Sequence, residues 1–201
     1  MAKPMNNIPS TANAVTPPAF EYGEDYAFYD ARMKRPPDYY QKILATATKT
    51  IQIWETHSNA EVDWKVFSEV KCPQVDITIL TICDKNLSDE SAVRLLADNI
   101  VNNLNNAVKA CVLTIFAFHR SCIYNDLTWH DRFLVIDDTD YYLVGPSMNN
   151  QVGSDTSFGI HYLSKTSDRD LLKKKLDSFL PLTGSSKLRI KVTRKRPSNG
   201  K

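Results

Sequence analysis

The sequence has no long hydrophobic run. No stretch approaches the roughly 18 apolar residues that a transmembrane helix needs, and residues 1–7 lack the apolar core of a signal peptide. The sequence therefore predicts a soluble, cytoplasmic protein without a transmembrane segment. Its cysteines form no C-x-x-C pair, which favours neither a zinc site nor a disulfide framework. We expect small buried side chains at Cys72, Cys83, Cys111 and Cys122.

The chain also lacks internal repeats, so a site built on any one motif is present once. A length of 201 residues with 42% hydrophobic side chains is enough for one well-buried core. Residues 1–22 are rich in Pro, Asn, Ala and Thr and show no apolar periodicity, which predicts a disordered arm. We expect one domain over 23–184, followed by a basic strand and tail over 185–201.

The net charge of +2 is unevenly distributed. Acidic side chains outnumber basic ones in 23–184, whereas 185–201 has no acidic residue. A basic end of this kind is commonly solubilising, and less often it contacts nucleic acid or an anionic membrane. Its basic residues are Lys187, Arg189, Lys191, Arg194, Lys195, Arg196 and Lys201.

Apolar periodicity predicts helices that alternate with strands in the first half. Apolar residues recur at helical spacing in three segments. The first follows the proline pair Pro36-Pro37, the second follows Asn59, a plausible cap, and the third begins at Ser88. The second of these helices would present Val62, Val66, Phe67 and Val70 on one side. Segments rich in β-branched residues predict strands over 51–54, 75–82 and 112–118.

The second half predicts a hairpin, a further strand, a helix and an edge strand. The hairpin joins 132–136 to 141–144 through an acidic turn, and 158–163 is the next strand. A basic edge strand begins near residue 188. The whole is an α/β fold with a mixed β-sheet of about six to seven strands flanked by helices. The helix over 168–180 should turn Leu171, Leu172, Leu176 and Phe179 inward and Lys173, Lys174 and Lys175 outward.

Polar residues with a characteristic spacing surround the hairpin. His130-Asp131-Arg132-Phe133-Leu134-Val135-Ile136-Asp137 is followed by Gly145-Pro146-Ser147-Met148-Asn149. The two segments resemble the phospholipase D superfamily signature, His-x-Lys-x4-Asp and then Gly-Ser-x-Asn, with arginine in place of lysine. This resemblance implies a phospholipase D-like domain. The His-Asp-Arg start is also similar to the phospholipase D-like C-terminal domain of proteins with a microtubule-interacting and transport module, which implies lipid binding rather than hydrolysis.

The chemistry of such a site follows from its residue types. Strand alternation places His130 and Arg132 on one face. A neutral imidazole can displace an alcohol from phosphorus, and water can discharge the resulting phosphoramide, so neither a metal nor a cofactor is needed. Arg132 can direct two donors at phosphate oxygens, and Ser147 and Asn149 add neutral donors. We predict that His130, Arg132, Ser147 and Asn149 are catalytic, that Trp129 and Gly145 complete the binding surface, and that Asp137 either supports the site or only shapes the turn.

Hydrolysis also needs a group that protonates the leaving oxygen. In the superfamily a second histidine from another motif copy does this, so one copy per chain implies a symmetric homodimer. The sequence departs from the superfamily pattern at two further positions, and both departures favour a protein that binds its ligand without hydrolysing it. Pro146 displaces Ser147 by one residue, and Phe158 lies near the place where the superfamily has a carboxylate that orients the histidine. Asp155 could replace that carboxylate if its loop folds back.

The sequence leaves three functions open. The first is a homodimeric, metal-independent phosphodiesterase, specifically a nuclease. The second is a catalytically inactive phospholipase D-like module that binds phosphate groups of nucleic acid or lipid, or a protein partner. The third is a structural subunit of a larger assembly. Nucleic acid is favoured over lipid as the ligand, and the tail 185–201 is the candidate polyanion contact.

Overall fold

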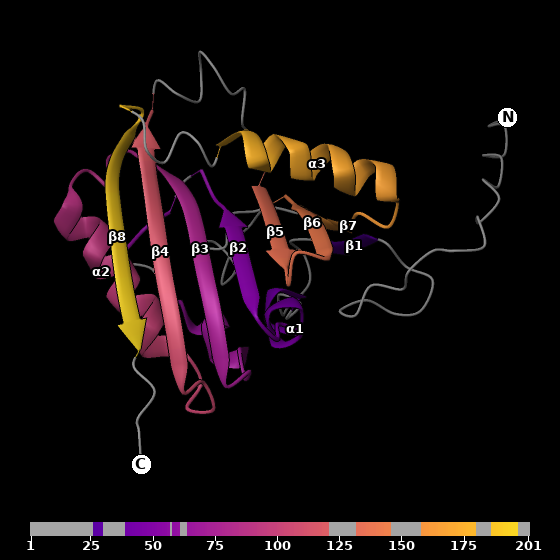
Figure 1. Ribbon diagram of the computed structural model, residues 1–201, viewed down its shortest axis with the longest axis horizontal. Coiled ribbons are helices and arrows are strands. Elements are labelled where there is room, and N and C mark those ends of the chain that lie inside the picture. Colours follow the sequence, from indigo (N-terminus) through magenta and orange to yellow (C-terminus); the bar gives the residue numbers. More distant parts are fainter. Residues whose placement is uncertain are drawn as a thin grey trace, which may run out of the picture.

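The computed structural model describes residues 26–29, 39–56, 58–60, 64–120, 132–145, 158–179 and 186–196. These form one eight-stranded mixed sheet with strand order β1-β7-β6-β5-β2-β3-β4-β8 (Figure 1). Along the chain the elements are β1 (Tyr26–Tyr29), α1 (Tyr39–Ala45), β2 (Thr50–Trp54), the 3-10 helix η1 (Lys65–Glu69), β3 (Gln74–Cys83), α2 (Glu90–Asn103), β4 (Ala110–His119), β5 (Arg132–Ile136), β6 (Asp140–Val144), β7 (Phe158–Tyr162), α3 (Thr166–Phe179) and β8 (Leu188–Arg196).

Strands β2, β3 and β4 are parallel, and the other pairings are antiparallel. The two parallel connections run through η1 and α2. The carboxyl ends of the three parallel strands therefore meet at one edge of the sheet. In the antiparallel neighbour β5, the start of the strand lies at that same edge, because Trp54 near the end of β2 pairs with Phe133.

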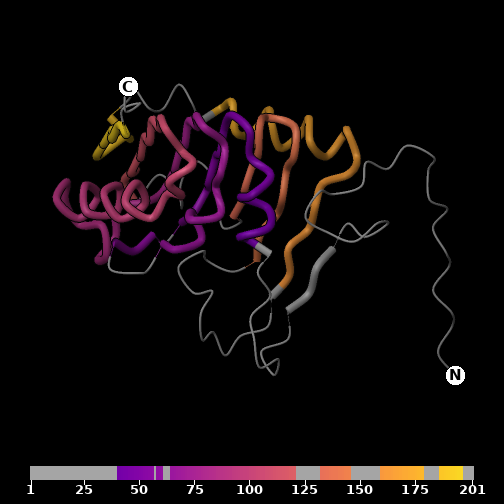
Figure 2. Tube along the Cα trace, turned by 90° about the horizontal axis from the view of Figure 1, so that it is seen from below, coloured from indigo at the N-terminus to yellow at the C-terminus, as the bar shows by residue number. Residues whose placement is uncertain are grey.

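Helices cover both faces of the sheet, with α2 on one side and α3 on the other (Figure 2). The side chains of β5 alternate between two cores, as strand geometry requires. Leu134 and Ile136 belong to the core that includes α1, η1 and α2. Val135 belongs to the second core, beneath Leu172 and Leu176 of α3.

The sequence predictions of an α/β class, a mixed sheet, the hairpin and a basic edge strand are confirmed. The sheet has eight strands because β1, which the sequence did not indicate, pairs with β7 at one edge. Helix α2 begins close to the predicted start at Ser88, and the Asp89 side chain caps it by accepting a hydrogen bond from the Ala92 N–H. The three lysines of α3 are exposed, as expected.

Two predictions were wrong. Within the described residues, which omit 61–63, the helix expected after Asn59 is only the five-residue η1, which buries Val66 and Phe67. Asn59 does not cap it; its carbonyl accepts a hydrogen bond from Trp64 Nε1. Leu171, expected to face inward, is 71% exposed, because the stripe that docks α3 on the sheet is carried by Leu172 and Leu176.

Other sequence predictions fall partly outside the described residues. The arm 1–22 and Cys122 lie there, so the proposed domain boundaries stay predictions. Cys83 and Cys111 are buried and Cys72 is half-buried, close to expectation. In the described part of the chain, no helix has the length and apolar character that a membrane crossing requires.

Candidate functional site

The buried polar side chains of the described residues gather at the carboxyl ends of β2 and β3. They are Glu55, Thr56, Ser58 and Thr81. Glu55 follows β2 directly, and its N–H donates to the Leu80 carbonyl of β3. In parallel sheets this edge is where ligands usually bind. The Ser58 and Thr81 hydroxyls are fully buried and have no hydrogen-bond partner within the described ranges, a feature that often marks a functional site.

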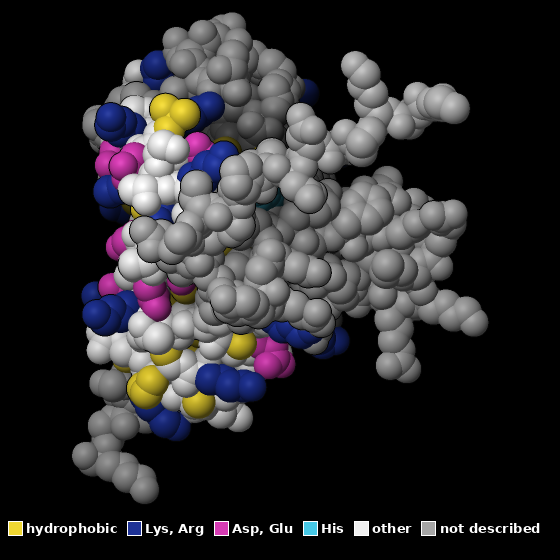
Figure 3. Space-filling model, turned by 90° about the vertical axis from the view of Figure 1, so that its right-hand side faces the viewer, with side chains coloured by type: hydrophobic (Ala, Val, Ile, Leu, Met, Phe, Trp, Pro, Cys, Tyr) yellow, Lys and Arg dark blue, Asp and Glu magenta, His cyan; other side chains and the backbone are white. Residues whose placement is uncertain are grey.

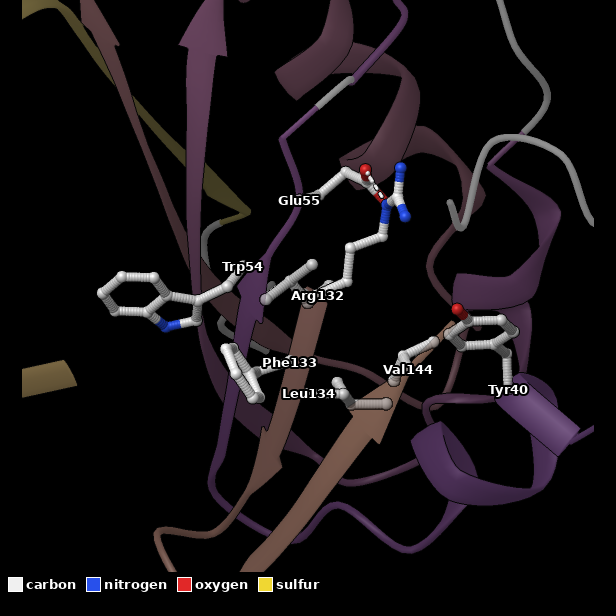
Figure 4. Close-up of a pocket in the computed structure, with 8 residues that line it drawn as sticks. Tyr40, Trp54, Glu55, Arg132, Phe133, Leu134 and Val144 are labelled. Atoms are coloured by element: carbon white, nitrogen blue, oxygen red, sulfur yellow. Dashed lines mark hydrogen bonds and ion pairs between the residues drawn. The ribbon is translucent and has the colours of Figure 1, made fainter. Parts of the chain in front are cut away.

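Arg132 enters this cluster from the first position of β5. Its Nε donates to Glu55 Oε1 at 2.8 Å, and its Nη1 donates to the Gly145 carbonyl at 2.9 Å. The Glu55 side chain is 1% exposed and that of Arg132 is 22% exposed, so the ion pair is largely shielded from water. Figure 4 shows the two side chains pointing toward one another from neighbouring strands. Arg132 thus joins the end of β2 to the residue that follows β6.

A small cavity lies beside this ion pair. It has a volume of ≈ 10 Å³, about the minimum that holds one water molecule. Tyr40 of α1 lines it and is 2% exposed. Burial, reinforced by the negative charge of Glu55 and partly offset by Arg132, raises the pKa of Tyr40 well above its usual value. The Tyr40 phenol therefore stays protonated at neutral pH and can act only as a neutral donor or acceptor.

Asp137 lies at the opposite end of β5 from Arg132. Its carboxylate accepts hydrogen bonds from the Thr48, Lys49 and Thr50 N–H groups and from the Thr48 hydroxyl. Asp137 also adopts a positive φ of 53° in the turn. Burial raises its pKa, but the hydrogen bonds outweigh burial, so the pKa lies below the usual value. Asp137 thus anchors the α1–β2 connection and has no described contact with Arg132.

The remaining motif residues are not placed. His130, Trp129, Ser147 and Asn149, with Pro146 and Asp155, lie outside the described residues, so their site roles stay predictions. Gly145 is exposed directly after β6, and its N–H donates to the Gly159 carbonyl of β7. His119 and His161 are exposed on β4 and β7. Of the predicted site residues, the structure brings together Arg132 and Gly145.

Three residues near Arg132 were missed by the sequence interpretation. Glu55, Thr81 and Tyr40 belong to no motif. The sequence held one weak indication that Glu55 belongs to a site: a run of polar residues begins at Glu55, directly after the predicted strand 51–54. Nothing marked Thr81, since a threonine fits the β-branched pattern of β3. Tyr40 fits the helical apolar spacing predicted after Pro36-Pro37, with Ile43, Leu44 and Ala47, and that pattern gives it no role in a site.

The charges of the cluster limit what it can bind. Among the described residues, no group of three or more His, Cys, Asp or Glu side chains could hold a metal ion. The guanidinium Nη2 of Arg132 makes no hydrogen bond to a residue in the described ranges. Since Nε and Nη1 are occupied, Arg132 can offer an incoming anion Nη2 and the second hydrogen of Nη1. That is a small donor surface suited to one or two oxygens of a phosphate.

Neither a protein-family model nor a curated protein matches the sequence. Solved structures do show similarity. NucT from Helicobacter pylori has a TM-score of 0.51 with 8% identity, over 78% of this chain and 95% of that protein. Nuc from Salmonella typhimurium, a phospholipase D family member, has a TM-score of 0.45 with 8% identity, over 75% of this chain and 86% of that protein.

A third similar structure is TrmBL2, an archaeal chromatin protein whose structure shows a novel mode of DNA binding. Its TM-score is 0.43 with 11% identity over 81% of this chain, and the chain spans 55% of its length. At such identities the likeness concerns the fold and not the chemistry. The layered α/β architecture and the likeness to NucT lead to one conclusion, which concerns the fold alone: the chain has a phospholipase D-like fold.

Proposed function

We propose that the protein is a metal-independent phosphodiesterase that cleaves nucleic acid as a homodimer in the cytoplasm, with His130 as the nucleophile. The observation that carries the proposal is the placement of Arg132, two residues after His130 in the sequence. Its guanidinium is fixed by Glu55 and by the Gly145 carbonyl at the edge of the sheet where parallel strands end. A guanidinium fixed before substrate arrives loses little freedom when it binds a phosphate.

The reaction would proceed in two displacements. A nitrogen of the neutral His130 imidazole attacks phosphorus, and the bond from phosphorus to one ester oxygen breaks. The partner subunit's His130 gives its proton to that oxygen, which leaves as an alcohol. The same histidine then takes a proton from water, whose oxygen attacks phosphorus and releases the phosphomonoester from His130. Arg132 stabilises the negative charge on the phosphate oxygens in both steps.

The test measures cleavage of a fluorescently labelled oligonucleotide and of bis(4-nitrophenyl) phosphate by the full chain in excess chelator. We expect cleavage by the wild-type protein, and loss of at least about 100-fold in His130→Ala. His161→Ala is the matched control, because His161 is an exposed histidine on β7. Light scattering should give the mass of a dimer. Undiminished cleavage by His130→Ala, or an active monomer, would contradict the proposal.

A second candidate is a phosphate-binding module without turnover. The observation that favours this candidate is the ion pair of Arg132 with Glu55. The Glu55 side chain is buried, and its Oε1 lies 2.8 Å from Arg132 Nε, so its negative charge offsets that of the guanidinium. An anion that approaches Arg132 meets a pair with no net charge, which weakens the long-range attraction. The module would bind phosphate groups of nucleic acid in a salt-dependent way and show no hydrolysis of either substrate. Binding that depends on Arg132, without any turnover, would select this candidate.

A further inference from the structure

The structure separates the basic residues of β8 into two groups. Arg194 donates to the Asp98 carboxylate of α2, and Arg196 donates to the Leu104 and Asn105 carbonyls just after that helix. These two arginines share a face of β8 with the buried Val192 and fasten the strand to α2. Their donors are committed to the protein itself, and they are therefore poorly placed to bind a partner.

The other face of β8 is exposed and carries Lys191, Thr193 and Lys195. Alternation directs these side chains to the α3 side of the sheet. Neither lysine forms an ion pair with another described residue. The Lys191 ammonium lies 5.2 Å from the centroid of the Phe116 ring of β4, a cation–π contact that holds the charge above the sheet surface.

The sheet surface beside these lysines is open. Helix α3 lies over the β5–β6–β7 side of the sheet, and no described helix covers the amino-terminal half of β4 or the adjoining part of β8 on this face (Figure 1). On this open face, Lys195 pairs with Val112, which is 38% exposed, and Thr193 pairs with Thr114. A hollow of ≈ 170 Å³ extends from Lys195 across Val112 to Gln74 and Asp76 of β3. The sheet face thus offers two separated cations, hydroxyl donors between them and a shallow concavity.

The opposite end of the molecule is charged differently. On the side that Figure 3 presents, basic and acidic side chains are interspersed over the described surface. On α3, for example, Lys173 forms an ion pair with Asp177. The exposed face of β8 carries no acidic residue of its own. In the pairing register Asp76 of β3 lies two strands away, where it lines the β3 end of the same hollow as Lys195.

We propose that the open face of β8, through Lys191, Thr193 and Lys195, binds the phosphodiester backbone of a nucleic-acid strand along the sheet edge. Four residues of extended chain separate the lysines by about 13 Å, so they would contact different phosphates. The choice of nucleic acid among polyanions rests on the proposed function. A second copy of the chain is a poor occupant, because antiparallel pairing of two β8 strands would set like charges opposite one another.

The experiment measures affinity for a labelled oligothymidylate of about 20 nucleotides over a series of salt concentrations. The protein is the full chain in a His130→Ala background, so that bound strand is not cut. Each lysine that neutralises a phosphate of a single strand contributes about 0.7 to the slope of log affinity against log salt. Lys191→Gln with Lys195→Gln should therefore lower the slope by about 1.4. The control, Lys174→Gln with Lys175→Gln, removes the same charge from exposed positions on α3 and should leave the slope unchanged.

Three results would overturn the inference: an unchanged slope in the β8 variant, an equal loss in the α3 control, or equal competition by poly-glutamate of matched charge. The measurements also distinguish failure of this inference from failure of the proposed function. If β8 is not involved, the β8 variant binds normally while bis(4-nitrophenyl) phosphate is still cleaved in the wild-type background. If catalysis is absent, neither substrate is cleaved, but the β8 variant still loses oligonucleotide affinity.

Discussion

The ion pair between Arg132 and Glu55 can be quantified by a double-mutant cycle. Removing one partner of a buried pair leaves the other charge unpaired, and the cost is greatest when the charge that remains is the more deeply buried of the two. Glu55 is 1% exposed, so we expect Arg132→Gln to lower the free energy of unfolding by about 3 kcal/mol. The reverse change, Glu55→Gln, should cost about 1–2 kcal/mol, since Arg132 is 22% exposed and still donates to the Gly145 carbonyl.

The double variant should be only about 2 kcal/mol less stable than the wild type, because two neutral amides replace the charges. The coupling energy of the cycle is then about 2–3 kcal/mol. Equilibrium urea unfolding at neutral pH, followed by circular dichroism, measures all four proteins. The slope of the free energy of unfolding against urea concentration should be the same in all four proteins, which would show that each exposes the same amount of surface on unfolding.

A second ion pair in the same chain provides the control. Arg194 and Asp98 are hydrogen-bonded, but their side chains are 30% and 49% exposed. The cycle of Asp98→Asn and Arg194→Gln should give a coupling energy below about 1 kcal/mol, as exposed pairs do. A coupling energy for Arg132 and Glu55 no larger than that of the control would refute the description of a shielded ion pair at the site.

Three further predictions concern the fold. Leu172→Ala should lower stability by about 2–4 kcal/mol and Leu171→Ala should have little effect, measured by urea unfolding, because only Leu172 is buried. Burial raises the pKa of the Cys111 thiol to about 12, so alkylation at pH 8 should be slow in the folded protein and fast in urea. Asp137→Asn should be destabilising at pH 7, and the deficit should shrink as pH falls. The folded pKa of Asp137 is depressed, so its contribution exists above about pH 4 and is lost as pH falls through the folded pKa. A constant deficit across this range would contradict the contacts described for Asp137.

Local pattern was enough to predict most of the fold. The β-branched run of β3, the caps of α2 and the acidic turn between β5 and β6 each act over a few residues, so sequence spacing alone identifies them. The helix expected after Asn59 failed because an apolar stripe cannot show how many residues fit before Pro73 and β3. Leu172 and Leu176 of α3 were predicted correctly, but Leu171 was wrongly included in the inward stripe, since neighbouring leucines fit a helical period equally well.

The candidate site was harder to predict, because its contacts join distant parts of the chain. Arg132 was recognised from its motif, but its partner Glu55 is 77 residues away in sequence. Only the pairing of β2 with β5 brings the two together, and no local pattern encodes that register. Alternation along the strand does predict that Lys191 lies on the face opposite Val192. For the same reason as with Glu55, the sequence could not show that Arg194 and Arg196 contact α2.

The position of β8 also has a consequence for synthesis of the chain. Strand β4 is covered on one side by β3, which precedes it, and on the other by β8, which is made about 70 residues after His119. At ribosomal rates of about 5–20 residues per second, the apolar β4 waits several seconds for its second neighbour. An unpaired strand of this kind recruits other chains. The nascent protein is therefore most exposed to aggregation just before β8 emerges, and truncation ahead of residue 188 would make that exposure permanent.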